Sequence, residues 1–305
     1  MPKVRAPGPD PTQIGDVSAP AFAVLPDPAA LFSRRAARFA TLAQSHPLAP
    51  YLSFLAALSA VQRDLLDDLP EPAAPSPDDL ARAREFGMPP LNRARFAPDA
   101  AFGATLDRLF DRCGSIPAPE AATAALARVA SADAGARLFF AQNVLADAIP
   151  MDALAEHVFV AAALQIHFAR LAARLDPATL VPVADGVCPA CGGAPGVSLV
   201  VGWQGAHGAR FCSCSSCATL WNYVRIRCTA CGSTKGVGYR EIEGGSGAIK
   251  AECCDECGSY LKILYQTQDP ALDPVADDVA SLGLDLLVRE GGSRRFGVNP
   301  YSIGY

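Results

Sequence analysis

Cysteine pairs with a fixed two-residue spacing dominate the C-terminal half of the chain. Ten of the eleven cysteines lie between residues 188 and 257. Eight of them form four Cys-x-x-Cys pairs: Cys188 and Cys191, Cys214 and Cys217, Cys228 and Cys231, Cys254 and Cys257. One pair brings two sulfurs within reach of an ion, and a tetrahedral site needs two such pairs. The sequence therefore predicts two closed metal sites of four thiolates each.

The spacing between the pairs indicates which cysteines share an ion. Stretches of 22 residues separate the first pair from the second and the third from the fourth, and each cysteine of the first two pairs recurs 40 positions later. This internal repeat favours grouping the first pair with the second and the third with the fourth. An interleaved grouping is the alternative, but it would make the repeat accidental. A disulfide framework would not need the strict two-residue spacing.

Length and composition limit the class of protein. The 305 residues suggest about two domains, and a content of 50% hydrophobic residues predicts a folded core. The formal net charge is −5, and bound thiolate sites add further negative charge, so a nucleic-acid partner is not expected. No apolar run approaches the roughly 20 residues that cross a bilayer, and residues 1–18 do not resemble a signal peptide. We therefore expect a cytoplasmic protein without membrane insertion.

Helical periodicity extends through the N-terminal half. Residues 1–27 are rich in Pro, Ala and Asp, and we expect them to be extended or disordered. Residues 28–180 are expected to form an all-α domain, in which the apolar helix 152–175 is central and Leu138, Phe139 and Phe140 lie inside. The expected helices are 28–46, 50–69, 77–86, 99–113, 119–132, 136–149 and 152–175.

The pattern becomes strand-like after Gly186. Residues 186–226 and 227–268 are expected to form two tandem ribbons, rubredoxin-like or zinc-ribbon modules that each contain one set of four cysteines. Units of this size bury too little apolar surface to be stable alone, so a metal ion is expected to hold each one. Residues 269–305 are expected to form an amphipathic helix, 274–289, and a turn-rich tail. The predicted class is therefore α+β and multidomain. The expected strands are 197–203, 209–214, 219–227, 237–242, 248–253 and 260–266.

Several short motifs in a fixed order resemble the FdhE family of formate dehydrogenase accessory proteins. They cover about a third of the chain, and the helical half fits in length and character. The motifs are Cys188-Pro-Ala-Cys-Gly192, the run 211–221, Cys228-Thr-Ala-Cys231, Lys250-Ala-Glu252, Cys254 to Cys257, Tyr260-Leu-Lys262 and the run 274–282.

The resemblance implies a cytoplasmic protein that is not an enzyme and that helps the catalytic subunit of a respiratory formate dehydrogenase to become active, before twin-arginine export. It also implies iron in rubredoxin-like sites. The helical domain would serve as a platform, and a groove would receive the target subunit or its N-terminal segment. An acidic metal-bearing half would attract a segment with paired arginines at short range.

The identity of the two metal ions separates the alternatives. Four thiolates accept either iron or zinc, and geometry does not choose between them. The resemblance favours iron slightly over zinc, and an iron–sulfur cluster is a lesser option. Iron would allow a redox-active protein, an electron carrier or reductase acting on the dehydrogenase, whereas zinc would make the ribbons structural interaction modules.

The remaining cysteines are interpreted more simply. Cys212 and Cys253 lie beside the paired cysteines but not at equivalent positions of the repeat, so we interpret them as ordinary buried cysteines rather than reactive thiols. Cys113 lies in an apolar helix and is expected in the core.

No catalytic constellation emerges from the other polar residues. His157 and His167 lie on one apolar helix at a spacing that does not suit a shared ion, and we expect them to be satisfied histidines of the core or of a groove. His46 and His207 have no ligand spacing. The adjacent acids Asp277 and Asp278 are explained by the dipole at a helix start.

Overall fold

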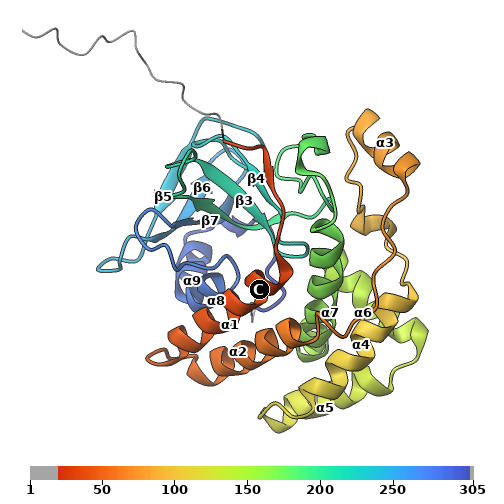
Figure 1. Cartoon of the computed structure of the whole chain (residues 1–305). Helices are drawn as coiled ribbons and strands as arrows, with labels where there is room; N and C mark the ends of the chain where they lie inside the picture. The colour runs from red at the N-terminus through yellow and green to blue at the C-terminus, as the bar shows by residue number, and fades with distance from the viewer. Residues whose placement is uncertain (1–19, 303–305) are drawn as a thin grey trace, which may run out of the picture.

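The computed structural model describes residues 20–302. Figure 1 shows the helices of the N-terminal half gathered beside a sheet that carries the last two helices. The predicted α+β class is confirmed. The helices are α1 (Pro28–Ala43), α2 (Ala49–Asp64), α3 (Pro77–Glu85), α4 (Ala100–Cys113), α5 (Glu120–Ser131), α6 (Ala134–Leu145), α7 (Leu154–Ala172), α8 (Ala276–Ala280) and α9 (Leu282–Glu290), with 3-10 turns at Arg93–Arg95, Met151–Ala153 and Pro177–Thr179.

Helix α7 is the centre of the helical half, as its continuous apolar sequence predicts. Every residue from Glu156 to Ala172 is buried, and α4, α5 and α6 all pack against it. Side-chain caps begin several of the surrounding helices. The Asp27 carboxylate accepts a hydrogen bond from the amide of Ala30, and the Asp99 carboxylate accepts one from the amide of Phe102. Such caps satisfy amides that have no partner within the helix. None of the helices between residues 20 and 302 is long and apolar enough to cross a membrane.

The ends and the buried faces of the predicted helices differ from the structure in places. Helix α2 ends at Asp64 rather than at residue 69, where further acids, Asp67 and Asp68, would oppose the negative end of the helix dipole. Phe139 is 58% exposed, because α6 buries the face that carries Ala141, Val144 and Leu145.

The two ribbons form one continuous sheet instead of separate modules. Strands β4, β3 and β2 of the first ribbon are followed in the sheet by their repeat equivalents β7, β6 and β5, and the join is a parallel pairing of Ser198 with Ile263. Strand β1 extends the sheet at β4, where Ala23 pairs with Trp221. The strands are β1 (Ala23–Val24), β2 (Pro195–Val200), β3 (Arg210–Cys214), β4 (Leu220–Asn222), β5 (Val237–Arg240), β6 (Ile249–Cys254), β7 (Ser259–Tyr265) and β8 (Arg294–Arg295).

The predicted C-terminal helix is broken into α8 and α9 at Ser281. The Ser281 hydroxyl donates to the carbonyl of Asp277 at 2.7 Å, a local bond that competes with helix continuation. The Lys262 ammonium donates to the carbonyls of Asp278 and Ser281 at 2.8 and 3.1 Å. A lysine from β7 therefore takes the carbonyls that a continuous helix would use. Asp277 and Asp278 do lie in the first turn of α8, but both are buried and ion-paired, so the helix dipole alone does not explain them.

Candidate metal centres

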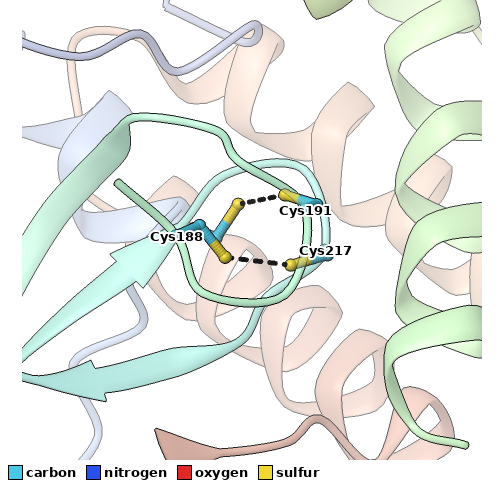
Figure 2. Close-up of side chains that lie close together, drawn as sticks. Cys188, Cys191 and Cys217 are labelled. Carbon is cyan, nitrogen blue, oxygen red and sulfur yellow. Dashed lines mark hydrogen bonds between the residues drawn. The ribbon is translucent and has the colours of Figure 1, made fainter. Parts of the chain in front are cut away.

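The eight paired cysteines meet in two groups of four. The first cluster contains Cys188, Cys191, Cys214 and Cys217, the second contains Cys228, Cys231, Cys254 and Cys257, and within each cluster the sulfurs lie within 4.8 Å of one another. These are the groupings that the repeat favours, and the chain does not interleave the pairs. Figure 2 shows the labelled side chains of Cys188, Cys191 and Cys217 turned toward one centre.

The sulfur separations suit a tetrahedral ion. The Cys188–Cys217 and Cys191–Cys214 sulfur distances are 3.6 and 3.4 Å, and the Cys228–Cys257 and Cys231–Cys254 distances are 3.7 and 3.8 Å. A tetrahedron with metal–sulfur bonds of about 2.3 Å places its sulfurs about 3.8 Å apart. No disulfide joins any of the eleven cysteines. Each cluster could therefore hold one metal ion, and the chemistry of four thiolates admits iron or zinc.

The same backbone turn builds all four pairs. In each turn, the amide of the residue after the second cysteine donates to the carbonyl of the first cysteine, at 2.8–3.1 Å. That residue has a positive φ in every case, which favours glycine. Three of the four positions hold glycine, and Ala218 is the exception with a φ of 58°. The four residues are Gly192, Ala218, Gly232 and Gly258.

The first cluster is enclosed by the helical half. Its sulfur-bearing residues are at most 2% exposed, and they belong to the same hydrophobic core as helix α7. The side-chain amide of Gln165 on α7 donates to the carbonyl of Ser215 at 2.9 Å. On the other side, the amides of Leu91 and Arg93 donate to the carbonyls of Ala190 and Cys191, both at 2.9 Å. Both turns of this cluster are thus fixed by elements outside the ribbon.

The second cluster is more open. Cys231 is exposed and Cys257 is partly exposed, whereas Cys228 and Cys254 are 6% and 3% exposed. Its first turn rests on the segment that leads into the first cluster: a Cβ on Gly186 would lie only 2.2 Å from the carbonyl oxygen of Thr229. Only glycine fits there, so the two clusters share one short connecting segment.

Comparison with known proteins decides the family. Residues 20–185, 187–225 and 226–301 match the family models described as FdhE N-terminal, FdhE central domain and FdhE C-terminal domain. The chain belongs to the FdhE family. An FdhE homolog of Rhizobium meliloti (strain 1021) is 49% identical over 299 residues, covering 97% of this chain and 98% of that protein. An FdhE homolog of Stutzerimonas stutzeri (strain A1501) is 38% identical over 285 residues, covering 91% of each chain.

A solved structure extends this likeness to the fold. The crystal structure of the FdhE protein from Pseudomonas aeruginosa superposes with a TM-score of 0.82 at 34% identity, covering 92% of this chain and 98% of that one. The helical half, the sheet and the C-terminal helices therefore belong to one FdhE architecture.

The crowding of four thiols within this FdhE fold calls for a counter-charge. Burial raises the pKa of Cys188 far above that of an ordinary thiol. Hydrogen bonds from Cys188 and Cys191 lower the pKa of Cys214. Without a metal ion, the cluster therefore favours a thiolate at Cys214 and protonated thiols at Cys188 and Cys191. In the second cluster, burial raises the pKa of Cys228 to about 12. A divalent cation would remove this conflict because it stabilises every thiolate at once.

The cysteines outside the clusters are buried. Cys212 is fully buried with a pKa that burial raises to about 11, and Cys113 is 3% exposed with a pKa raised to about 12. Cys253 is 4% exposed, and burial raises its pKa too. A high thiol pKa disfavours the nucleophilic thiolate, which agrees with the interpretation of these residues as ordinary buried cysteines.

The two core histidines differ in their partners. His157 is hydrogen-bonded, as predicted: its Nδ1 lies 2.6 Å from the carbonyl of Ala153 and its Nε2 lies 3.2 Å from Asn143. His167 is 4% exposed, and its Nδ1 has no hydrogen-bond partner among the described residues. The expectation of a satisfied histidine is therefore wrong for the Nδ1 of His167, whose ring lines a groove and packs among phenylalanine rings.

Sequence reasoning missed the residues that position the clusters. Gln165 was hidden in an apolar helix, where its polar side chain was the only available signal. A buried ion pair between Arg210 and Glu252, at 2.7 Å, joins the two ribbons across the sheet. The Arg210 side chain also donates to the carbonyl of Arg227, at 3.0 Å, just before Cys228. Such long-range pairs leave no periodic pattern in a sequence.

Proposed function

We propose that this protein is a cytoplasmic accessory protein that brings the catalytic subunit of a formate dehydrogenase to its active state. Its membership of the FdhE family over nearly the whole chain carries the proposal. The protein acts by binding that subunit through its metal-bearing half and is not itself an enzyme. The eight paired cysteines bind two metal ions, one for each cluster.

The groove between α1 and the sheet is the best candidate for the docking site of the target. A cavity of about 590 Å³ lies there, within the usual range for ligand pockets. Its walls include Arg34 on α1 and Trp203 after β2, and its floor includes Ser213 and Ala218, which flank the second turn of the first cluster. A segment bound in this groove would therefore lie next to the turn that holds Cys214 and Cys217.

The charge of this groove differs from the sequence-based expectation. Three arginines of α1, Arg34, Arg35 and Arg38, line it together with Asp27 and Asp273, so a target segment with paired arginines gains no net attraction there. Arg38 is neutralised by Asp277 at 2.7 Å and Arg35 faces Asp273 at 3.6 Å, but Arg34 has no ion pair among the described residues. An apolar segment with few charges fits these walls better.

Co-purification tests the proposal. The tagged full-length chain is expressed with the catalytic subunit of a formate dehydrogenase in a strain that lacks its own FdhE protein. We expect the subunit to co-purify and formate oxidation to be restored. Cys254→Ser should abolish both and lose one metal ion per chain, because metal binding here stabilises the ribbon. The neighbouring variant Cys253→Ala is the control, because Cys253 is outside both clusters.

Groove variants locate the docking site. Trp203→Ala and Arg34→Glu should weaken co-purification without loss of metal. Phe139→Ala, which removes a more exposed aromatic ring outside the groove, should not. If Cys254→Ser retained both metal ions and full activity, the proposed role of the second cluster would be refuted.

We propose iron rather than zinc as the natural ion, on the basis of the family resemblance. Protein purified without added metal should then contain about two iron atoms per chain and absorb visible light when oxidised. Iron would supply one-electron chemistry, and the cysteines would supply the thiolate ligands. Colourless protein with two zinc ions would instead assign the clusters a structural role.

A further inference from the structure

The two clusters differ most in access to their ligands. In the first cluster, Cys188, Cys191 and Cys217 are fully buried and Cys214 is 2% exposed. In the second, Cys231 is exposed and Cys257 is partly exposed. An incoming ligand can therefore reach the sulfur of Cys231 from solvent, whereas it meets no exposed sulfur at the first cluster.

Substitution at the first cluster requires the helical half to open. Its turns are held from α7 through Gln165 and from the segment that contains Leu91 and Arg93. The Arg93 side chain also pairs with Asp147 at 2.5 Å, which fixes that segment to the end of α6. All of these contacts must break before a ligand reaches Cys191, and such openings are rare in a packed core.

The second cluster is held by its own sheet and by nearby loops. The Tyr223 hydroxyl lies 3.1 Å from the carbonyl oxygen of Cys228 and 3.0 Å from Asp185, and Arg227 donates to the carbonyl of Gly232 at 3.1 Å. The amide of Arg294 donates to the carbonyl of Gly258 at 2.7 Å. No hydrogen bond to the turns of this cluster comes from α1 to α7 in the described part of the chain. Cys231 is the most exposed of the four ligands, so it can leave the ion while the other three stay in place.

We propose that the second cluster is the site where the protein exchanges its metal ion with thiols, with Cys231 as the ligand that is displaced first. The proposal rests on metal binding by both clusters. An incoming thiol loses its proton and forms a metal–sulfur bond as the bond from the ion to Cys231 breaks. The released Cys231 thiolate takes up that proton, so the oxidation state of the metal does not change.

Kinetics of metal release test the proposal on the full-length chain loaded with two zinc ions. Glutathione is the incoming thiol, and the chromophoric chelator 4-(2-pyridylazo)resorcinol reports free zinc. One zinc per chain should leave at a rate that rises with glutathione concentration. The other should leave at least about 100-fold more slowly, at a rate independent of glutathione, because local opening limits it.

Variants and labelling assign the two phases. Cys231→Ser should abolish the fast phase and keep the slow one, while Cys253→Ala should keep both. Brief treatment of the zinc-loaded wild-type chain with iodoacetamide should modify Cys231 and Cys257 before any cysteine of the first cluster, a result that does not depend on any variant folding.

Other outcomes would overturn the proposal. Equal release rates, or earlier labelling of the first cluster, would show that exposure does not control exchange, even though both clusters bind metal. A chain that takes up no zinc or iron at all would refute metal binding itself, and with it this proposal.

Discussion

The two ribbons are attached to the rest of the molecule in different ways. The first is joined to the helices through the neutral amide of Gln165, which donates to Ser215 at 2.9 Å and accepts from Arg35, Gln62 and Tyr301 at 3.1, 3.3 and 2.9 Å. The second is joined to α8, α9 and β8 by charges. Lys262 pairs with Asp278 and Asp285, and all three side chains are fully buried.

This difference predicts different responses to damage. Arg295 pairs with Asp278 at 2.7 Å and with Asp285 at 2.9 Å, so two buried cations balance two buried anions. Removal of one cation leaves a charge without compensation in a dry site, which is far more destabilising than the loss of a neutral hydrogen bond. The ionic attachment should therefore be the more fragile of the two.

The largest effect is expected for Lys262→Met. It removes one of the two buried cations that face Asp278 and Asp285, and we expect a loss of about 3–5 kcal/mol in the free energy of unfolding. Urea unfolding of the metal-loaded chain measures it. The matched control is Lys250→Met on the adjacent strand, where the pair with Glu241 is solvent-exposed and should contribute at most about 1 kcal/mol. Equal losses for the two variants would contradict the comparison.

The helical half should be the first part to respond to acid. Burial lowers the pKa of His167 to about 4, below its ordinary value, so the stability that its neutral form provides is complete above about pH 6.5 and declines as the pH falls toward 4. The full decline is about 3 kcal/mol at most. The charges of Arg295 and Lys262 lower the pKa of Asp278 despite its burial, so the ionic attachment loses stability only below about pH 4.

His167→Phe tests this order because phenylalanine suits the surrounding rings of Phe96, Phe102 and Phe168. Between pH 7 and 4, the variant should lose less unfolding free energy than the wild type at the same metal occupancy. Parallel pH profiles for the two proteins would show that His167 does not set the acid response.

A smaller loss is expected for Gln165→Leu. The substitution leaves the carbonyl of Ser215 and three donors, on Arg35, Gln62 and Tyr301, without this partner, at a cost of about 1–3 kcal/mol. Urea unfolding again measures it, with the exposed Gln268→Leu as control. A loss larger than that of Lys262→Met would reverse our ranking of the two attachments.

The smallest effect is a gain. Ile226, in the segment that enters the second ribbon, has a φ of 58°, which a β-branched residue disfavours. Ile226→Gly should raise the unfolding free energy by about 1 kcal/mol, since relief of the left-handed strain exceeds the entropy cost of glycine. Val224→Gly is the control. Val224 is similarly exposed but does not have a positive φ, so this variant should have a lower unfolding free energy than the wild type.

Local patterns explain what could be predicted from the sequence. The apolar run of α7 and the repeat of the cysteine pairs are regular over many residues, so the central helix and the grouping of the sulfurs followed from them. The break at Ser281 depends on Lys262, a residue of another strand, and the parallel join between β2 and β7 depends on strands buried on both faces. Neither leaves a periodic signal. The contrast between an open and a closed cluster likewise arises from tertiary packing.

The pairing of Ala23 with Trp221 has a consequence for biosynthesis. A ribosome delivers the N-terminal strand first, and its partner emerges only after the whole helical half has been made. During that interval the edge of β1 has no neighbour in the sheet, and the first cluster lacks Cys214 and Cys217. Pairing of β1 with β4 and assembly of the first metal site therefore become possible at nearly the same moment of translation.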